Sequence, residues 1–200
     1  MTPSEDSATA RGTRPGPAAA ARQMGTIPML AVTSLGLGFL RPASGTWGSL
    51  PPAIVAAVLL LAEQPGWIID VCLLLTLAIG CVACIRFGVA SERAFGKKDP
   101  GQVVADEVAG QSIALLGLPW VGVASWSGTV VPPADCSPLV FNLAMVAAGF
   151  LLFRILDILK PPPANGLQKL GGGLGILVDD LIAGAMALVV LQLAVRLLFT

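Results

Sequence analysis

The 200-residue chain contains no histidine, and only 12% of its residues are charged. Soluble domains carry about 25% charged residues. With 55% hydrophobic residues and a mean hydropathy of +0.82, the chain is expected to be an integral membrane protein. Its net charge of zero gives no basis for a nucleic-acid partner. The missing histidine excludes every mechanism that uses an imidazole as nucleophile, base or metal ligand.

Cysteine is also scarce, with four residues at Cys72, Cys81, Cys84 and Cys136. Cys81 and Cys84 have the CxxC spacing, but no second pair and no histidine complete a zinc site. Three of the four lie in an apolar stretch, where small soft side chains pack well. We therefore expect packing rather than metal or redox chemistry.

The first 25 residues have no long apolar run of the signal-peptide kind. Arginines stand there among Ala, Gly, Pro, Ser and Thr, a composition that predicts a disordered tail over 1–25. Met24 and Met29 are alternative starts. The remainder, 26–200, is predicted to form one membrane domain.

Long hydrophobic stretches predict the architecture. A membrane-spanning helix needs about 20 mainly apolar residues, and four stretches come close: 67–85, 108–123, 138–159 and 181–199. A fifth, 50–62, is short, and with 27–40 it is interrupted by glycine and proline. The sequence thus predicts an all-α, multi-pass helical membrane bundle of about four to five spans, with 27–62 either spanning or re-entrant.

Basic residues cluster in alternate loops. They occur before residue 50, in the loop 86–107 and around 154–169, whereas 63–66 and 124–137 have none. Because short loops rich in Lys and Arg stay in the cytoplasm, we expect five crossings that begin in the cytoplasm. This topology places all the acidic motifs described next on the cytoplasmic side.

Five of the twelve acidic residues lie at the edges of apolar stretches: Asp106, Glu107, Asp157, Asp179 and Asp180. Carboxylates are costly beside hydrocarbon and are seldom placed there without a partner. In a chain without histidine, clustered carboxylates indicate a hard divalent cation with oxygen ligands, and Mg²⁺ fits best.

The pairs Asp106–Glu107 and Asp179–Asp180 are both predicted to lie in the first turn of a helix. There the helix dipole stabilises negative charge. Helix capping alone is the competing interpretation. Two such pairs at helix starts on one side of the membrane count against capping alone.

Arg154, Asp157 and Lys160 are spaced i, i+3, i+6 at the end of an apolar stretch, so they share roughly one face of a helix. They could form a self-satisfied ladder of ion pairs with snorkelling basic ends. Alternatively, Arg154 and Lys160 bind an anionic group such as phosphate, and Asp157 binds a metal.

The segment 45–49 is predicted to be a loop of small residues. Its backbone N–H groups and the hydroxyls of Thr46 and Ser49 could bind phosphate oxygens. Together these motifs suggest phosphoryl chemistry. The sequence lacks the Cys-x₅-Arg loop of cysteine phosphatases and the Asp-x-Asp-x-Thr stretch of aspartyl-phosphate mechanisms, which leaves metal-assisted attack by water.

These motifs, in this order, resemble the phosphatidylglycerophosphatase A family of bacterial membrane enzymes. The matching stretches are 36–40 with 45–50, 106–111, 153–154 with 157–161, and 172, 175–176 and 179–184. The resemblance covers about residues 30 to 195. The family usually has other residues where this chain has Ser44, Ala105, Ser112 and Leu177, but no charged residue is lost.

The resemblance implies Mg²⁺-dependent hydrolysis of phosphatidylglycerophosphate to phosphatidylglycerol and phosphate, a step of phospholipid biosynthesis in the bacterial inner membrane. The five carboxylates would then include the metal ligands and a base for the attacking water. Arg154, Lys160, Thr46 and Ser49 would bind the phosphate. A transporter that uses the carboxylates as an ion or proton relay is the alternative, and a non-catalytic scaffold leaves the motifs unexplained.

Overall fold

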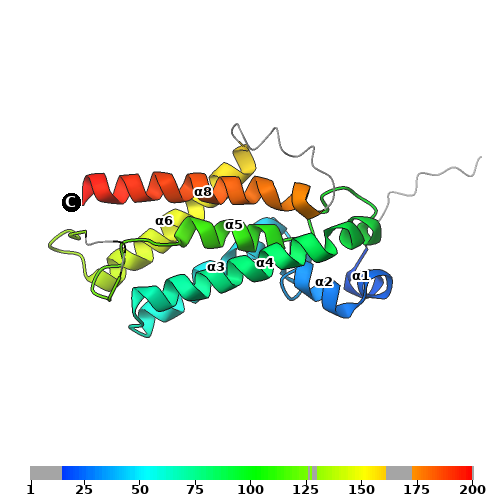
Figure 1. Ribbon diagram of the computed structural model, residues 1–200, viewed down its shortest axis with the longest axis horizontal. Helices are drawn as coiled ribbons and strands as arrows, with labels where there is room; N and C mark the ends of the chain where they lie inside the picture. Colours follow the sequence, from blue (N-terminus) through cyan, green and yellow to red (C-terminus); the bar gives the residue numbers. More distant parts are fainter. Residues whose placement is uncertain (1–14, 126, 128–129, 161–172, 200) are drawn as a thin grey trace, which may run out of the picture.

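The structure is a computed structural model that describes residues 15–125, 127, 130–160 and 173–199. The described residues form helices and connecting segments without β-strands, as the sequence predicts (Figure 1). The elements are α1 Pro17–Met24, α2 Thr26–Val32, the 3₁₀ helix η1 Leu37–Phe39, α3 Ser44–Leu61, α4 Gly66–Phe95, α5 Ala105–Leu115, α6 Pro138–Leu159 and α8 Gly173–Leu198.

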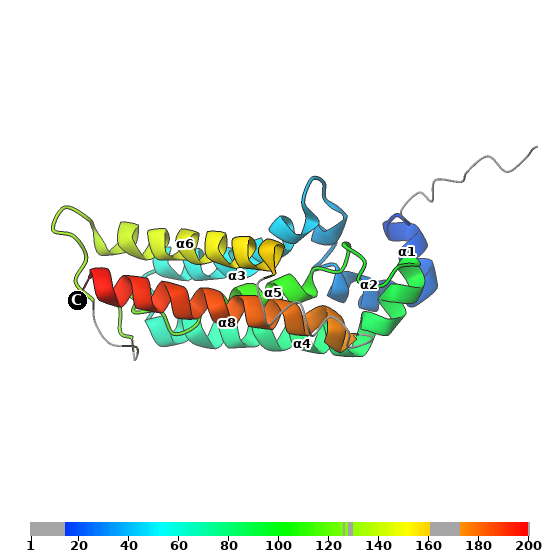
Figure 2. The same ribbon diagram turned by 90° about the horizontal axis from the view of Figure 1, so that it is seen from above.

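Within the described residues, α3, α4, α6 and α8 are long and apolar enough to cross a membrane. They lie side by side along the long axis of the molecule (Figures 1 and 2). Their outward faces carry exposed apolar side chains, such as Leu75 and Val82 on α4 and Leu151 on α6. An apolar outer surface is what hydrocarbon requires. The predicted multi-pass helical membrane bundle is thus confirmed.

Another segment, 105–124, runs through the bundle but is helical only in its first part, and we call it the broken pass. Helix α5 ends at Leu115, where the sequence predicted a span over 108–123. Gly117 has a positive φ of 64°, and Pro119 disfavours helix at the residue before it. Beyond α5 the chain continues to the far end of the bundle, where the Ala124 carbonyl accepts a hydrogen bond of 2.8 Å from Gly66 N–H at the start of α4.

Side chains of the long helices satisfy the backbone of this broken pass. Asp70 accepts a hydrogen bond from Gly117 N–H at 2.8 Å, and Gln192 donates to the Gly117 carbonyl at 2.5 Å. Asn142 both accepts from Val121 N–H and donates to the Val121 carbonyl, each at 2.9 Å. Non-helical backbone is tolerated at membrane depth only with such partners. We call Asp70, Asn142 and Gln192 the backbone clamp.

Ser44–Leu61 is one continuous helix that is long and apolar enough to span, which is one of the two alternatives left open for 27–62. Two other sequence-based expectations differ from the structure. Helix α4 extends to Phe95, ten residues into the predicted 86–107 loop. Pro17–Met24 is helical within the segment expected to be disordered. Residues 1–14 of that tail and the segment 161–172 lie outside the described residues.

Glycines set the separation of α5 from α8. A Cβ at Gly110 would lie 2.5 Å from the Asp180 carbonyl oxygen, and Gly184 faces the Gly110 backbone. Small residues let helix backbones approach closely inside a membrane bundle. This contact brings the start of α5 against the acidic turn of α8. Cys84 lies in the same part of the core, consistent with its predicted packing role.

Candidate active site

The predicted motifs gather at one end of the bundle, which we call the acidic mouth. The beginnings of α3, α5 and α8 and the ends of α4 and α6 lie at this end (Figure 2). The acidic mouth therefore contains all five predicted carboxylates, contributed by α5, α6 and α8. The structure thus agrees with the prediction that the motifs share one side.

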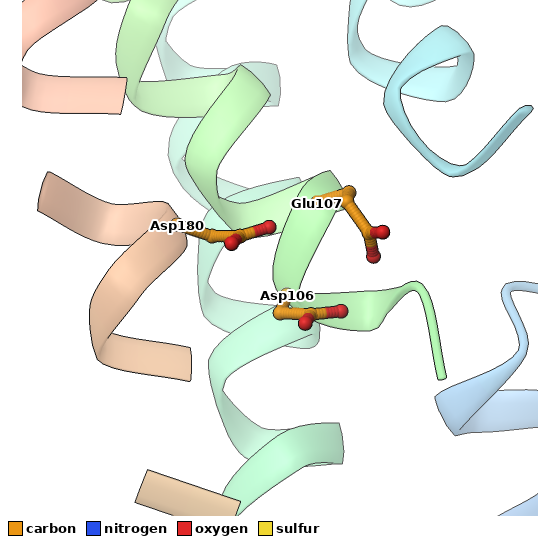
Figure 3. A group of neighbouring side chains, drawn as sticks. All are labelled: Asp106, Glu107 and Asp180. Carbon is orange, nitrogen blue, oxygen red and sulfur yellow. The ribbon is translucent and has the colours of Figure 1, made fainter. Parts of the chain in front are cut away.

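Three of the five carboxylates form a cluster. Asp106 and Glu107 on α5 and Asp180 on α8 each offer an oxygen, and these oxygens lie within 4.8 Å of one another (Figure 3). Asp106 and Asp180 are buried. Each of the three also has a buried oxygen without a hydrogen-bond partner in the described part of the chain. Buried like charges at this separation require a cation or a proton.

The other two carboxylates each contact a basic residue. Asp157 accepts a hydrogen bond of 2.7 Å from Arg154, one turn earlier on α6. Asp179 contacts Lys160 Nζ at 3.2 Å across the gap between α6 and α8. The predicted ladder along α6 is therefore split, because Lys160 pairs with α8.

The ion pair with Asp179 changes the titration of Lys160, which follows the last residue of α6. Burial lowers the pKa of Lys160, but the hydrogen bond to Asp179 and the negative charges of Asp179, Asp180 and Asp157 together raise it by more. The net result is a pKa above the ordinary lysine value. Lys160 therefore stays positively charged beside the acidic cluster at neutral pH.

The predicted glycine loop is instead the first turns of α3. Ser49 Oγ donates to the Gly45 carbonyl at 2.8 Å, as within a helix, and accepts from Arg154 at 3.5 Å. A Cβ at Gly45 would lie 2.5 Å from Glu107 Oε1 and 2.8 Å from an Arg154 nitrogen. Gly45 is thus needed for close packing against the site. Thr46 is half-buried in the same turn, and its role stays a prediction.

The helix-start prediction holds for only one acidic pair. Asp106 and Glu107 lie in the first turn of α5, but its N-cap residue, Val104, makes no side-chain capping bond. Asp179 and Asp180 lie inside α8, which begins at Gly173. Capping therefore cannot explain Asp179 and Asp180, and their burial needs another reason.

Sequence reasoning missed two polar residues near the cluster. Gln111, one turn beyond Glu107, is fully buried, and neither its amide nitrogen nor its oxygen has a partner among the described residues. Its polar character inside an apolar stretch was the available signal. Asp99 lines a cavity of about 180 Å³ with Lys98, Gly175, Ile176 and Asp179. Tertiary packing brings Asp99 to these residues of α8, so its position in the sequence gave no signal.

The donor set suits a hard divalent cation. Carboxylate oxygens are the ligands that Mg²⁺ takes in proteins, and the three clustered residues keep oxygens that nothing else satisfies. Beside the cluster, Arg154 Nε is buried without a partner in the described chain. A guanidinium with a free edge can bind a phosphate oxygen. The acidic mouth can thus hold a cation and a phosphate side by side.

Fold and site together define a class: a polytopic helical membrane protein with a cluster of buried carboxylates at one end. Comparison with known proteins gives the family. A model of the phosphatidylglycerophosphatase A family matches residues 30–195, and the chain belongs to this family.

Relatives support this assignment. A phosphatidylglycerophosphatase A of Haemophilus influenzae is 34% identical over 165 residues, covering 82% of this chain and 85% of its own. The protein of the same name from Escherichia coli is 30% identical over 159 residues, covering 79% and 77%. A Bacteroides thetaiotaomicron relative with the provisional name phosphatidylinositol-3-phosphatase is 30% identical over 171 residues, covering 84% and 93%. No solved structure matches the chain.

Proposed function

We propose that this protein hydrolyses phosphatidylglycerophosphate to phosphatidylglycerol and phosphate, with Mg²⁺ as its cofactor, as a step of phospholipid biosynthesis. The observation that carries the proposal is the cluster of Asp106, Glu107 and Asp180 beside the partly unpaired guanidinium of Arg154. Family membership supplies the substrate.

The five carboxylates divide into two roles. Asp106, Glu107 and Asp180 would hold the cation, because only they combine mutual proximity with unsatisfied oxygens. When bound, such a cation neutralises phosphate charge and lowers the pKa of a bound water. Asp157 and Asp179 orient Arg154 and Lys160 through their ion pairs.

The two basic residues would receive the phosphate. Arg154 Nε has no partner within the described residues and is free to donate to a phosphate oxygen. Ser49, which contacts Arg154, would hold the guanidinium in place. Lys160 stays protonated because the neighbouring carboxylates raise its pKa, and it can hold a second phosphate oxygen as a point charge. Thr46 is a further phosphate-binding candidate.

We propose that the acidic mouth faces the cytoplasm of a bacterial inner membrane. The last turns of α4 carry Arg86 and Arg93, and the segment after it carries Lys97 and Lys98, whereas 63–66 and 124–125 at the other end carry no basic residue. This asymmetry follows the positive-inside rule.

A transporter remains the alternative from another class, but the position of the acids disfavours it. All five candidate carboxylates lie at one end of the bundle, and a relay would need polar groups along its length. The buried carboxylate at the other end, Asp70, holds the backbone of the broken pass.

The test is phosphate release from phosphatidylglycerophosphate by the purified protein, with Mg²⁺ and after chelation. We expect activity that requires Mg²⁺ and is restored when the cation is added back. Phosphatidylinositol 3-phosphate and phosphatidic acid in parallel assays establish the specificity. Ion flux into liposomes without any phosphatase activity would instead support the transporter.

A further inference from the structure

An apolar cavity of about 440 Å³ adjoins the acidic mouth. It is lined by residues of α2, α3, α4, α5 and the segment between α2 and η1, including Leu30, Ala31, Leu35, Pro51, Ile79 and Val108. We call it the lateral groove. Its volume falls in the range of roughly 300–1,000 Å³ that ligand pockets occupy.

The lateral groove opens toward lipid. Leu35 and Ile79 on its rim are 84% and 66% exposed. Ile79 stands seven residues before Arg86, the first charged residue in the last part of α4. At 1.5 Å per residue this is about 10 Å along the helix, within the half-thickness of the hydrocarbon core, about 15 Å. The groove is therefore at the depth of the acyl chains in one leaflet.

The groove and the acidic mouth are both built on the first turns of α5. Ala105 and Val108 line it from the first turns of α5, and Asp106 and Glu107 stand between them on the same turn. Across the groove, Gly80 permits close contact of α4, since a Cβ there would lie 2.5 Å from the Ala105 carbonyl oxygen. A molecule with its phosphate at Asp106 and Glu107 thus has apolar surface beside it.

We propose that the lateral groove binds one acyl chain of the phospholipid substrate while its phosphate occupies the acidic mouth. This inference rests on the proposed function. Its basis is the apolar lining, the opening toward lipid and the shared turn of α5. The groove would draw the substrate sideways from the leaflet and select for chain length.

The test compares hydrolysis of phosphatidylglycerophosphate carrying two palmitoyl chains or two hexanoyl chains. Ala31→Trp fills the groove, and Ala147→Trp, at an exposed alanine of α6, is the control. We expect Ala31→Trp to lower kcat/KM for the palmitoyl substrate by about tenfold, the effect of roughly two unburied methylenes. Hydrolysis of the hexanoyl substrate, and both reactions of Ala147→Trp, should stay within about twofold.

A smaller change tests the groove even if Ala31→Trp does not fold. Ile79→Ala removes contact at the rim, and Leu75→Ala, on the same exposed face of α4, is its control. Ile79→Ala should lower kcat/KM for the long-chain substrate alone, by about threefold. Equal losses on both substrates, or none with either groove variant, would overturn the proposal.

A binding measurement separates this proposal from the proposed function. A substrate analogue with a photoreactive diazirine near the end of one acyl chain should label residues 30–37 in the wild type and label them less in Ala31→Trp. Such labelling without phosphate release would refute the proposed hydrolysis and keep the groove. Phosphate release with unchanged labelling in Ala31→Trp would refute the groove and keep the hydrolysis.

Discussion

Both ends of the bundle bury carboxylates, but the two ends differ in what those carboxylates face. At the far end, the backbone clamp of Asp70, Asn142 and Gln192 bonds to the backbone at Gly117 and Val121. At the acidic mouth, Asp106 and Asp180 are also buried, but their oxygens lie within 4.8 Å of each other and of Glu107. Burial alone therefore does not identify a functional group.

The carboxylates at the two ends differ in whether the fold compensates for their burial. Asp70 accepts the hydrogen bond that the broken pass needs, so the free-energy cost of burying it is offset within the fold. Asp106, Glu107 and Asp180 add repulsion that the described fold does not remove. Their arrangement is stable only with a cation or protons present, and this requirement is why we propose the acidic mouth as the site of the reaction.

The largest expected effect is at the cluster. Asp106→Asn keeps the shape of the side chain and removes one ligand charge, so we expect activity to fall about 10²- to 10³-fold. The melting temperature should stay the same or rise, because like-charge repulsion falls. Asp135→Asn, the same change at an exposed position before α6, is the control. Full activity of Asp106→Asn would remove this residue from the site.

Changes in the backbone clamp should lower stability and leave activity unchanged, the opposite of the result expected at the cluster. Asn142→Ala leaves both Val121 backbone groups without their partner, at a cost of about 2–4 kcal/mol in the free energy of unfolding. The kcat of the folded fraction should not change. Unfolding in detergent, with Ala147→Ser as an exposed control on the same helix, measures the loss. A fall in kcat at unchanged stability would contradict the division between the two ends.

Arg154→Lys tests a residue between these extremes. Lysine keeps the charge but loses the planar geometry with which Arg154 reaches Asp157 and Ser49. We expect kcat/KM to fall roughly tenfold with little change in stability. Arg93→Lys, near the end of α4 and away from the cluster, should retain full activity. Equal effects of the two changes would argue against a phosphate contact at Arg154.

The smallest effect concerns pH. Because the folded-state pKa of Lys160 is raised, its pairing with Asp179 stabilises the protein fully below pH 10.5 and is lost as pH rises through the folded-state value. The contribution should be about 1 kcal/mol or less, since Lys160 is partly exposed. The difference in unfolding free energy between wild type and Lys160→Met should be constant well below pH 10.5 and should shrink as pH rises above it. A difference that does not shrink would show that the ion pair does not contribute.

The sequence predicts the helices best where local signals agree. Ser137 caps α6 and Pro138 begins it, and the predicted bounds 138–159 match. The end of α4 was placed too early because Arg86 and Glu92 suggested a loop, whereas a helix can continue beyond the hydrocarbon. The break after Leu115 was signalled by Gly117 and Pro119, but the apolar run of 108–123 outweighed them.

The site was predictable as a set of residues but not as a geometry. Composition and motif order identify the five carboxylates. Which of them pair with Arg154 and Lys160 depends on how α6 and α8 are rotated against α5. Lys160 was expected to share a face with Asp157, and tertiary packing gives it Asp179 instead. The close packing at Gly45 and Gly110 is likewise a property of helix contacts.

The broken pass has a consequence for biogenesis. With 11 residues, α5 is too short to enter a bilayer by itself, and each carboxylate it carries opposes insertion by up to about 3 kcal/mol. The carbonyl of Gly117, just after α5, accepts its hydrogen bond from Gln192 on α8, a helix that is synthesised later. The acidic turn of α5 therefore reaches its place only after α8 has been delivered by the translocon. The long helices would therefore insert first, and the site would be completed in a later step.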